Sequence, residues 1–237
     1  MFKPFLAAAA AMALVAPAHA VIVTQWNFNS VVPDGSTGTG TTIPSTGVGT
    51  AALVGGTTAT FASGDASGGS SDPASGDDSA WNTTTYAAQG TGDKTRGASF
   101  AVSTVGYQDI LLSFDLRHSN TSSRFGAVQY TTDGSAWLDL GGFDADAGGD
   151  TWYARSFDFS AVDAADNNAS FAVRVLSTFA PGTPFYAATT SGSNYATAGT
   201  WRFDMVTISA APIPEPGTYA LLLAGLAAVG FMVRRRG

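Results

Sequence analysis

Few groups after position 20 could do acid–base chemistry. His118 is the only histidine in that part of the chain, and Asp115, Ser119 and Ser122 stand near it. A hydrolase triad places a histidine beside a serine nucleophile and an acid, but no Gly-x-Ser-x-Gly nucleophile elbow occurs there. The simpler interpretation of His118 is a polar residue where a strand meets a loop.

Carboxylates offer a second route to catalysis, because glycoside cleavage uses two carboxyl groups across the scissile bond. The acids between residues 21 and 211 are all aspartates, 17 in number, and the only glutamate is Glu215. Among so many aspartates some pair will lie close by chance, so a pair predicts little. Cysteine is absent, which excludes disulfides, thiol catalysis and cysteine zinc ligands.

One acidic segment has the composition of a metal-binding loop. Its aspartates are separated by small residues, which would let several oxygens converge on a hard cation such as calcium. The candidate ligands are Asp144, Asp146 and Asp150. The segment lacks the fixed glycine and distal glutamate of an EF-hand, and an acidic surface loop is the simpler interpretation. Calcium is the only cofactor that the sequence suggests.

Aromatic side chains in loop-like sequence could bind carbohydrate, because sugar rings stack on the faces of Trp and Tyr. The candidates are Trp81, Tyr86 and Tyr107, which lie among Gly, Ser and Thr residues. The tryptophans that alternate within strand-like segments are instead typical of core positions, namely Trp26, Trp152 and Trp201. Extracellular polysaccharide is therefore the candidate ligand.

Alternation of apolar and polar residues predicts that β-strands position these groups. Asp109–Arg117 alternates cleanly, and Phe125–Thr131 and Ala136–Leu140 flank Asp133-Gly134, a pair typical of hairpin turns. Further strands are expected at Val21–Phe28, Ala98–Val102, Trp152–Phe159, Ala169–Leu176 and Thr200–Ser209. Residues 21–211 show no helical periodicity. We predict an all-β fold, an antiparallel β-sandwich of jelly-roll type, over these residues.

Composition changes within this domain. Residues 32–92 are rich in Gly, Ser and Thr, so long loops with short strands near residues 51–54 and 60–62 are expected. Between residues 21 and 211, 17 aspartates stand against seven Lys and Arg. Nucleic acid is not expected as a partner, because phosphate binding needs a basic patch.

The N-terminal segment predicts export. Lys3 precedes an apolar run over residues 5–16, and Ala18-His19-Ala20 has the small-x-small form that signal peptidase cleaves. Residues 1–20 are therefore expected to be a signal peptide, with signal peptidase as a partner and Ala18 and Ala20 at the cleavage site.

The C-terminal segment, residues 212–237, combines three different parts. A stiff, proline-rich stretch contains Pro214, Glu215 and Pro216. Residues 218–233 carry no charge and are expected to form a single transmembrane helix, of roughly 22–26 Å against a bilayer core of ~30 Å. The chain then ends in a basic cluster, Arg234, Arg235 and Arg236, which the positive-inside rule places in the cytoplasm. A plain membrane anchor is the alternative interpretation.

In this fixed order, the three parts resemble the PEP-CTERM sorting signal of Gram-negative bacteria. The resemblance covers only about the last 25 residues. It implies exosortase as a partner, transient insertion in the inner membrane, removal of the apolar segment, and a destination at the cell surface or in the extracellular matrix. Residues 21–211 also loosely resemble jelly-roll modules of secreted bacterial proteins.

Together these features predict an exported surface or matrix protein without enzyme activity, whose β-sandwich binds polysaccharide or adds bulk to the matrix. The alternative is an exported hydrolase that acts on matrix polysaccharide or peptide, with His118 and aspartates as its acid–base groups.

Overall fold

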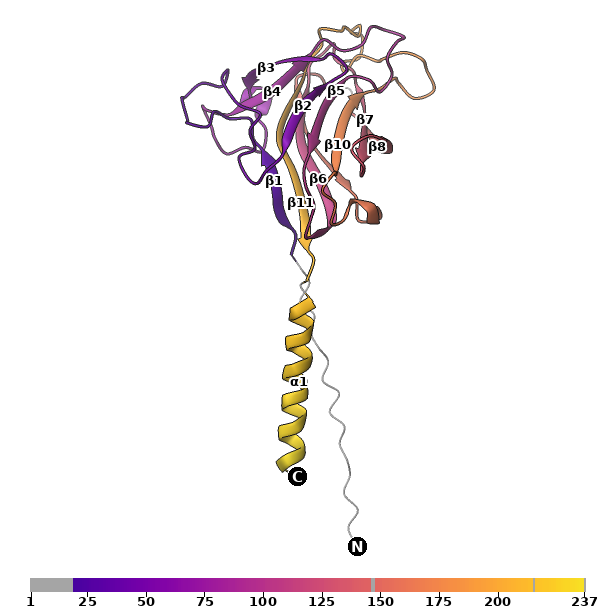
Figure 1. The fold of residues 1–237 in the computed structure, drawn as a ribbon. Helices are drawn as coiled ribbons and strands as arrows, with labels where there is room; N and C mark the ends of the chain where they lie inside the picture. Colours follow the sequence, from indigo (N-terminus) through magenta and orange to yellow (C-terminus); the bar gives the residue numbers. More distant parts are fainter. Residues whose placement is uncertain (1–18, 146–147, 215, 237) are drawn as a thin grey trace.

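Two antiparallel β-sheets face each other in this computed structural model, which describes residues 19–145, 148–214 and 216–236 (Figure 1). The six-stranded sheet contains β1 (Val21–Trp26), β3 (Thr58–Ser63), β4 (Ser79–Thr84), β6 (Tyr107–His118), β9 (Thr151–Asp158) and β11 (Trp201–Pro212). The five-stranded sheet contains β2 (Thr50–Val54), β5 (Gly97–Ala101), β7 (Phe125–Thr131), β8 (Leu138–Asp144) and β10 (Ala172–Ser177). The predicted antiparallel sandwich is confirmed, and its jelly-roll type stays a prediction.

Strand β11 lies inside the six-stranded sheet and pairs along both edges. One edge pairs with β6. The other edge pairs first with β4, at residues 201–203, and then with β1, at residues 206–210. The change of neighbour coincides with a bulge at Met205, which has a φ of +47°. Neither β4 nor β1 therefore pairs with Asp204 on that edge.

The core consists of large apolar side chains from the inner faces of both sheets. On β6 the predicted alternation is confirmed, because Ile110, Leu112 and Leu116 are fully buried. Phe100 of β5 meets Trp26 and Phe203 from the opposite sheet at ring-centroid distances of 5.3 and 6.0 Å. Such aromatic contacts contribute beyond the apolar area that they bury.

The loop-rich part of the sequence contains three strands, β2, β3 and β4. The first two match the short strands that were expected, and β4 was missed because its sequence is polar. Its hydroxyl groups are nevertheless buried and hydrogen-bonded. Ser79 Oγ donates to Thr39 O at 2.6 Å, and Thr83 Oγ1 donates to Trp201 O at 3.0 Å. Polar residues can occupy a covered strand when the backbone supplies their partners.

The predicted hairpin is confirmed as the β7–β8 pair. Gly134 has a φ of +76°, a conformation that glycine adopts without steric cost. Asp133 Oδ1 accepts bonds from the backbone amides of Ser135 and Ala136, both at 2.8 Å. The connection runs from residue 132 to residue 137, so it is longer than a two-residue turn.

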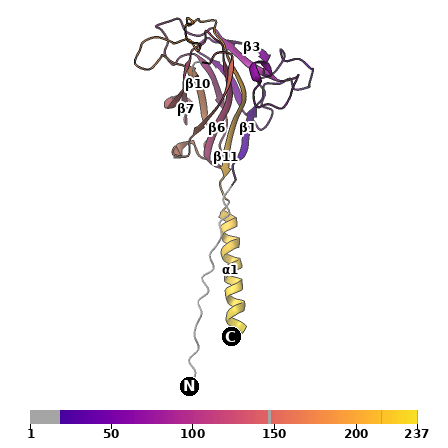
Figure 2. The ribbon, with the colours of Figure 1, turned by 180° about the vertical axis from the view of Figure 1, so that it is seen from behind.

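Helix α1 (Pro216–Arg236) follows β11 and points away from the sandwich (Figures 1 and 2). The strand ends at Pro212, and the next amide, Ile213 N, still donates to Gly106 O at 2.9 Å. Within the described residues no helix has the length and apolarity that crossing a membrane requires. The predicted transmembrane helix is therefore not confirmed.

Replacing Phe100 with alanine tests the core. The ring is fully buried between the sheets, so its removal leaves a cavity. We expect the free energy of unfolding, measured in urea, to fall by about 3–5 kcal/mol. The control is Phe185→Ala, whose ring is 53% exposed. If Phe100→Ala lowers the free energy of unfolding no more than this control does, the Phe100 ring is not packed between the sheets.

Candidate functional site

The outer face of the five-stranded sheet carries a group of polar side chains. Phe100 and Val173 point into the core, so the residues that alternate with them on β5 and β10 point outward. The register places Ser99, Arg174 and Gln129 side by side across β5, β10 and β7. The neighbouring row on the same face consists of small residues, Ala101, Ala172 and Thr131.

A chain of hydrogen bonds holds the polar row in place. Arg174 Nε donates to Gln129 Oε1 at 2.7 Å, and Gln129 Nε2 donates to Asp139 Oδ1 at 2.6 Å. Lys94 Nζ donates to the other oxygen of Asp139 at 2.7 Å, and this bond is the main reason that the pKa of Asp139 is lowered. The planar guanidinium, amide and carboxylate groups are thus oriented before any ligand binds.

Trp137 stands beside this row. The loop between β7 and β8 positions it, and the guanidinium carbon of Arg174 lies 4.3 Å from the centroid of its ring. Partial burial lowers the pKa of Arg174 from its ordinary value, but the group remains a cation that can lie against the ring. The indole is half-buried, so part of it remains accessible.

A groove of about 700 Å³ adjoins Trp137. Its aromatic lining residues are Trp137, Tyr107 and Phe171, and the small outer row described above forms part of its lining. Its remaining lining comes from β1, the segment before β2, β5 and the residues after it, the β7–β8 loop, and residues near the start of β10. An apolar groove with a few oriented polar groups at its side is the usual form of a ligand site.

The aromatic candidates from the sequence have different positions. Trp81 and Tyr86 are 5% and 2% exposed, so the expectation that they form an open stacking surface was wrong. Trp81 lies in strand β4 with its ring in the core, and Tyr86 Oη is hydrogen-bonded to Thr83 Oγ1 at 2.6 Å. Only Tyr107 lines the groove. Sequence reasoning missed Trp137, although its place three residues after Gly134 of the Asp-Gly turn was a usable signal.

The carboxylates of the predicted calcium loop contact arginines. Arg124 Nη2 lies 2.7 Å from Asp144 Oδ2, and Arg117 Nη2 lies 2.6 Å from Asp150 Oδ1. Asp146 lies outside the described residues. These arginines already offset the charge that would attract a cation, and calcium binding at this loop stays a prediction.

His118 is fully buried at the end of β6. Its ring lies 5.2 Å from that of Trp201 and 5.9 Å from that of Tyr153. Nδ1 donates to Ser123 O at 3.0 Å, since a carbonyl can only accept. A substrate that stays on the surface cannot reach this imidazole, so the geometry does not support its proposed role as a general base.

The predicted processing sites lie at the edges of the described chain. Pro214 is exposed, Pro216 begins α1, and Glu215 lies outside the described residues. The side chains of Arg234 and Arg235 are exposed, and that of Arg236 is not described. At the other terminus Ala20 is exposed directly before β1, whereas Ala18 lies outside the described residues.

Residues 212–236 match the family model described as the PEP-CTERM protein-sorting motif, so the chain carries this motif. No curated protein matches the sequence.

Among solved structures, the sandwich is similar to the CBM22-1 xylan-binding domain of Paenibacillus barcinonensis Xyn10C, with 10% sequence identity and a TM-score of 0.38. The match covers 69% of this chain and 87% of that domain. The CBM22-1–GH10 modules of Clostridium thermocellum xylanase 10B share 13% identity over 83% of this chain and 29% of theirs, with a TM-score of 0.46. The K1 adhesin domain of Porphyromonas gingivalis Lys-gingipain shares 11% identity over 81% of this chain and 98% of its own, with a TM-score of 0.41. At such scores the likeness carries no argument about function.

Burial of His118 makes stability depend on pH. Desolvation lowers its folded-state pKa to about 3 from an ordinary value of 6.5. As pH falls below 6.5 the unfolded chain gains a proton that the folded chain excludes, so stability is lost. In His118→Gln the difference in unfolding free energy between pH 7 and pH 4 should shrink by about 3 kcal/mol, measured in urea. An unchanged difference would contradict a buried, neutral imidazole.

Proposed function

We propose that this chain is an exported protein, that exosortase recognises its C-terminal tail and sorts it to the cell surface or extracellular matrix, and that its β-sandwich binds polysaccharide there without cleaving it. The observation that carries the sorting half is the PEP-CTERM motif at residues 212–236. The observation that carries the binding half is the groove beside Trp137 and the oriented polar row on the outer sheet face.

Export begins with the signal peptide proposed at residues 1–20. Cleavage after Ala20 would leave Val21 as the first residue, and Val21 already pairs with Ala210 at the start of β1. The mature N-terminus and the sorting tail therefore leave the sandwich beside each other. Transient attachment to the inner membrane of a Gram-negative bacterium, through the apolar tail, belongs to the same proposal.

The proline-rich stretch before α1 suits binding in an enzyme cleft. The prolines restrict φ and keep this short stretch extended, so binding it costs little conformational entropy. The stretch is also very short, because Ile213 is still bonded to the sandwich and α1 begins at Pro216. Exosortase would therefore act within a few residues of a folded domain.

Carbohydrate binding follows from the chemistry of the outer sheet face. Sugar rings offer apolar C–H faces that stack on an indole, and vicinal hydroxyls that bond planar groups in pairs. Trp137 supplies the indole, and Arg174, Gln129 and Asp139 supply the planar groups. An extended groove rather than a closed cavity suits a segment of a polymer.

Removing the motif tests the sorting half. Deleting Pro214–Pro216 should abolish processing, so that the unprocessed chain accumulates. The fraction of the protein at the surface should fall at least 10-fold, which corresponds to a loss on the order of 1.4 kcal/mol in the free energy of binding to exosortase. Mass spectrometry and surface labelling in an exosortase-containing host measure both quantities. Pro184→Ala, in a loop of the sandwich, is the matched control. Unchanged processing after the deletion would refute recognition of this motif.

Replacing Trp137 with alanine tests the binding half. Loss of a central aromatic contact should weaken binding by about 2 kcal/mol, roughly 30-fold, in affinity electrophoresis against a panel that includes xylan, cellulose and a bacterial exopolysaccharide. Phe185→Ala, an exposed aromatic outside the groove, should bind as the parent does. The same samples are assayed for new reducing ends. Equal binding by both variants would contradict the proposal that the groove binds polysaccharide. Release of new reducing ends would favour the hydrolase alternative.

A further inference from the structure

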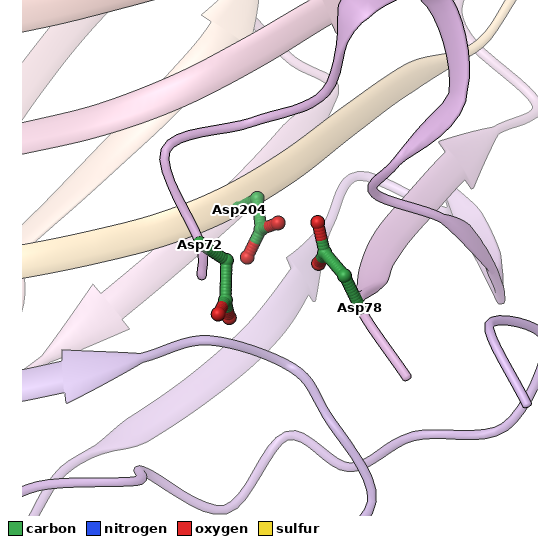
Figure 3. Close-up of side chains that lie close together, drawn as sticks. All are labelled: Asp72, Asp78 and Asp204. Carbon is green, nitrogen blue, oxygen red and sulfur yellow. The ribbon is translucent and has the colours of Figure 1, made fainter. Parts of the chain in front are cut away.

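Three aspartates that are distant in the sequence meet on the outer face of the six-stranded sheet. Asp204 comes from the bulge in β11, and Asp72 and Asp78 come from the segment between β3 and β4. One carboxylate oxygen of each lies within 4.8 Å of the others. Figure 3 shows the carboxyl groups of Asp204 and Asp78 facing each other, with the side chain of Asp72 beside them. None of the three lines the groove beside Trp137.

Two of these carboxyl groups are buried without complete hydrogen bonding. Asp204 is 0% exposed and Asp78 is 1% exposed. Asp204 Oδ2 and Asp78 Oδ1 have no hydrogen-bond partner, although both are shielded from water. A buried, unsatisfied carboxylate is costly, so an oxygen of this kind indicates a missing ligand or a bound proton.

The surrounding hydrogen bonds orient the cluster but leave those two oxygens free. Met205 N donates to Asp204 Oδ1 at 2.7 Å, and Ser70 Oγ donates to Asp78 Oδ2 at 3.2 Å. Asn29 Nδ2 donates to Asp72 Oδ2 at 2.9 Å. Ala74 N donates to the other oxygen of Asp72, Oδ1, also at 2.9 Å. Asp72 is thus held by both oxygens, whereas Asp78 and Asp204 are each held by one.

Negative charge in this cluster is not offset by a cation. None of the ion pairs among the described residues includes Asp72, Asp78 or Asp204. The arginines that reach the covering loop bond to it elsewhere, Arg117 to Ser67 Oγ and Arg202 to Ser63 O. Nearby acids add to the charge, namely Asp65 on the loop and Asp115 on β6, which accepts a bond from Ser71 N at 2.6 Å.

We propose that Asp72, Asp78 and Asp204 bind one Ca²⁺ ion, which fastens the β3–β4 segment onto strand β11. All the donor atoms are oxygens, which favours a hard cation. Ca²⁺ takes ligands at about 2.3–2.6 Å, so two ligands on opposite sides of the ion lie up to about 5 Å apart, which matches the spacing of the cluster. Mg²⁺ needs a tighter shell at about 2.0–2.1 Å and keeps more of its water.

The backbone beside the three aspartates packs closely against the carboxyl group of Asp78. A Cβ placed on Gly64 would come within 2.1 Å of Asp78 Oδ1, so only glycine fits against this carboxylate. Gly64 N also donates to Asp78 O at 2.9 Å, and Ser70 N donates to Gly64 O at 3.0 Å. Glycine thus lets the loop fold tightly around the oxygens, and the covering segment excludes water from them.

The carboxyl groups of the cluster repel one another. Burial is the main cause that raises the pKa values of both Asp78 and Asp204, and repulsion from Asp72 and from Asp78, respectively, adds to it. A bound cation would offset this repulsion.

The test uses the full chain, purified in mild detergent and freed of metal with EDTA. Titration calorimetry at pH 7.5 should show one Ca²⁺ per chain. At a Ca²⁺ concentration about 100 times Kd, Tm should rise by roughly 5 °C or more. The rise should be smaller with Mg²⁺. The absence of binding would overturn the proposal in favour of a shared proton, and an equal rise with both metals would overturn the assignment to Ca²⁺.

Matched variants locate the site. Asp204→Asn and, as a second variant at a half-buried position, Asp72→Asn should lose the Tm rise with Ca²⁺. In EDTA at pH 7.5 the Tm of Asp204→Asn should equal or exceed that of the parent, because repulsion is relieved. The exposed control Asp163→Asn should respond as the parent does. If Asp144→Asn and Asp150→Asn abolish the response and Asp204→Asn does not, the ion binds at the other loop and the proposal fails.

Discussion

The rest of the structure depends on the pairing of β11 along both of its edges. One edge pairs with β6, whereas the other serves β4 and β1 in turn. Because the strand is held on both sides, its inward side chains Trp201 and Phe203 have fixed positions in the core. The same strand runs directly into the sorting motif, so the motif continues the backbone of a central strand of the sandwich.

Where the neighbour of β11 changes, part of the edge of β11 has no strand beside it, and the loop between β3 and β4 covers that part. Where β4 stops and β1 begins, the strand bulges at Met205 and Asp204 lacks a strand beside it on that edge. The loop covers this part of the sheet through specific bonds, such as the one from Trp152 Nε1 to Ala66 O at 2.8 Å. Coverage buries Asp204, and burial is what makes its carboxyl group chemically unusual.

Charge is handled differently on the two outer faces. On the five-stranded sheet, Arg174, Gln129, Asp139 and Lys94 form a chain in which opposite charges lie close together. Such half-exposed groups contribute little to stability but can present oriented bonding groups to a ligand. On the six-stranded sheet, Asp72, Asp78 and Asp204 gather under a loop, and no ion pair among the described residues includes any of them. The first arrangement suits recognition, and the second suits binding of a cation.

The sequence by itself determined the features that depend on local pattern. The sorting motif is a contiguous signal, the β6 strand follows from alternation over neighbouring residues, and the hairpin follows from Asp133-Gly134. Only the tertiary structure decided which side chains are covered. Trp81 and Tyr86 stand in loop-like sequence but are buried by distant segments, whereas Trp137 stays accessible. Likewise Asp72, Asp78 and Asp204 meet only because β11 and the β3–β4 loop are brought together. Coverage of loop-like segments and convergence of separate residues depend on contacts between distant segments, which local periodicity does not report.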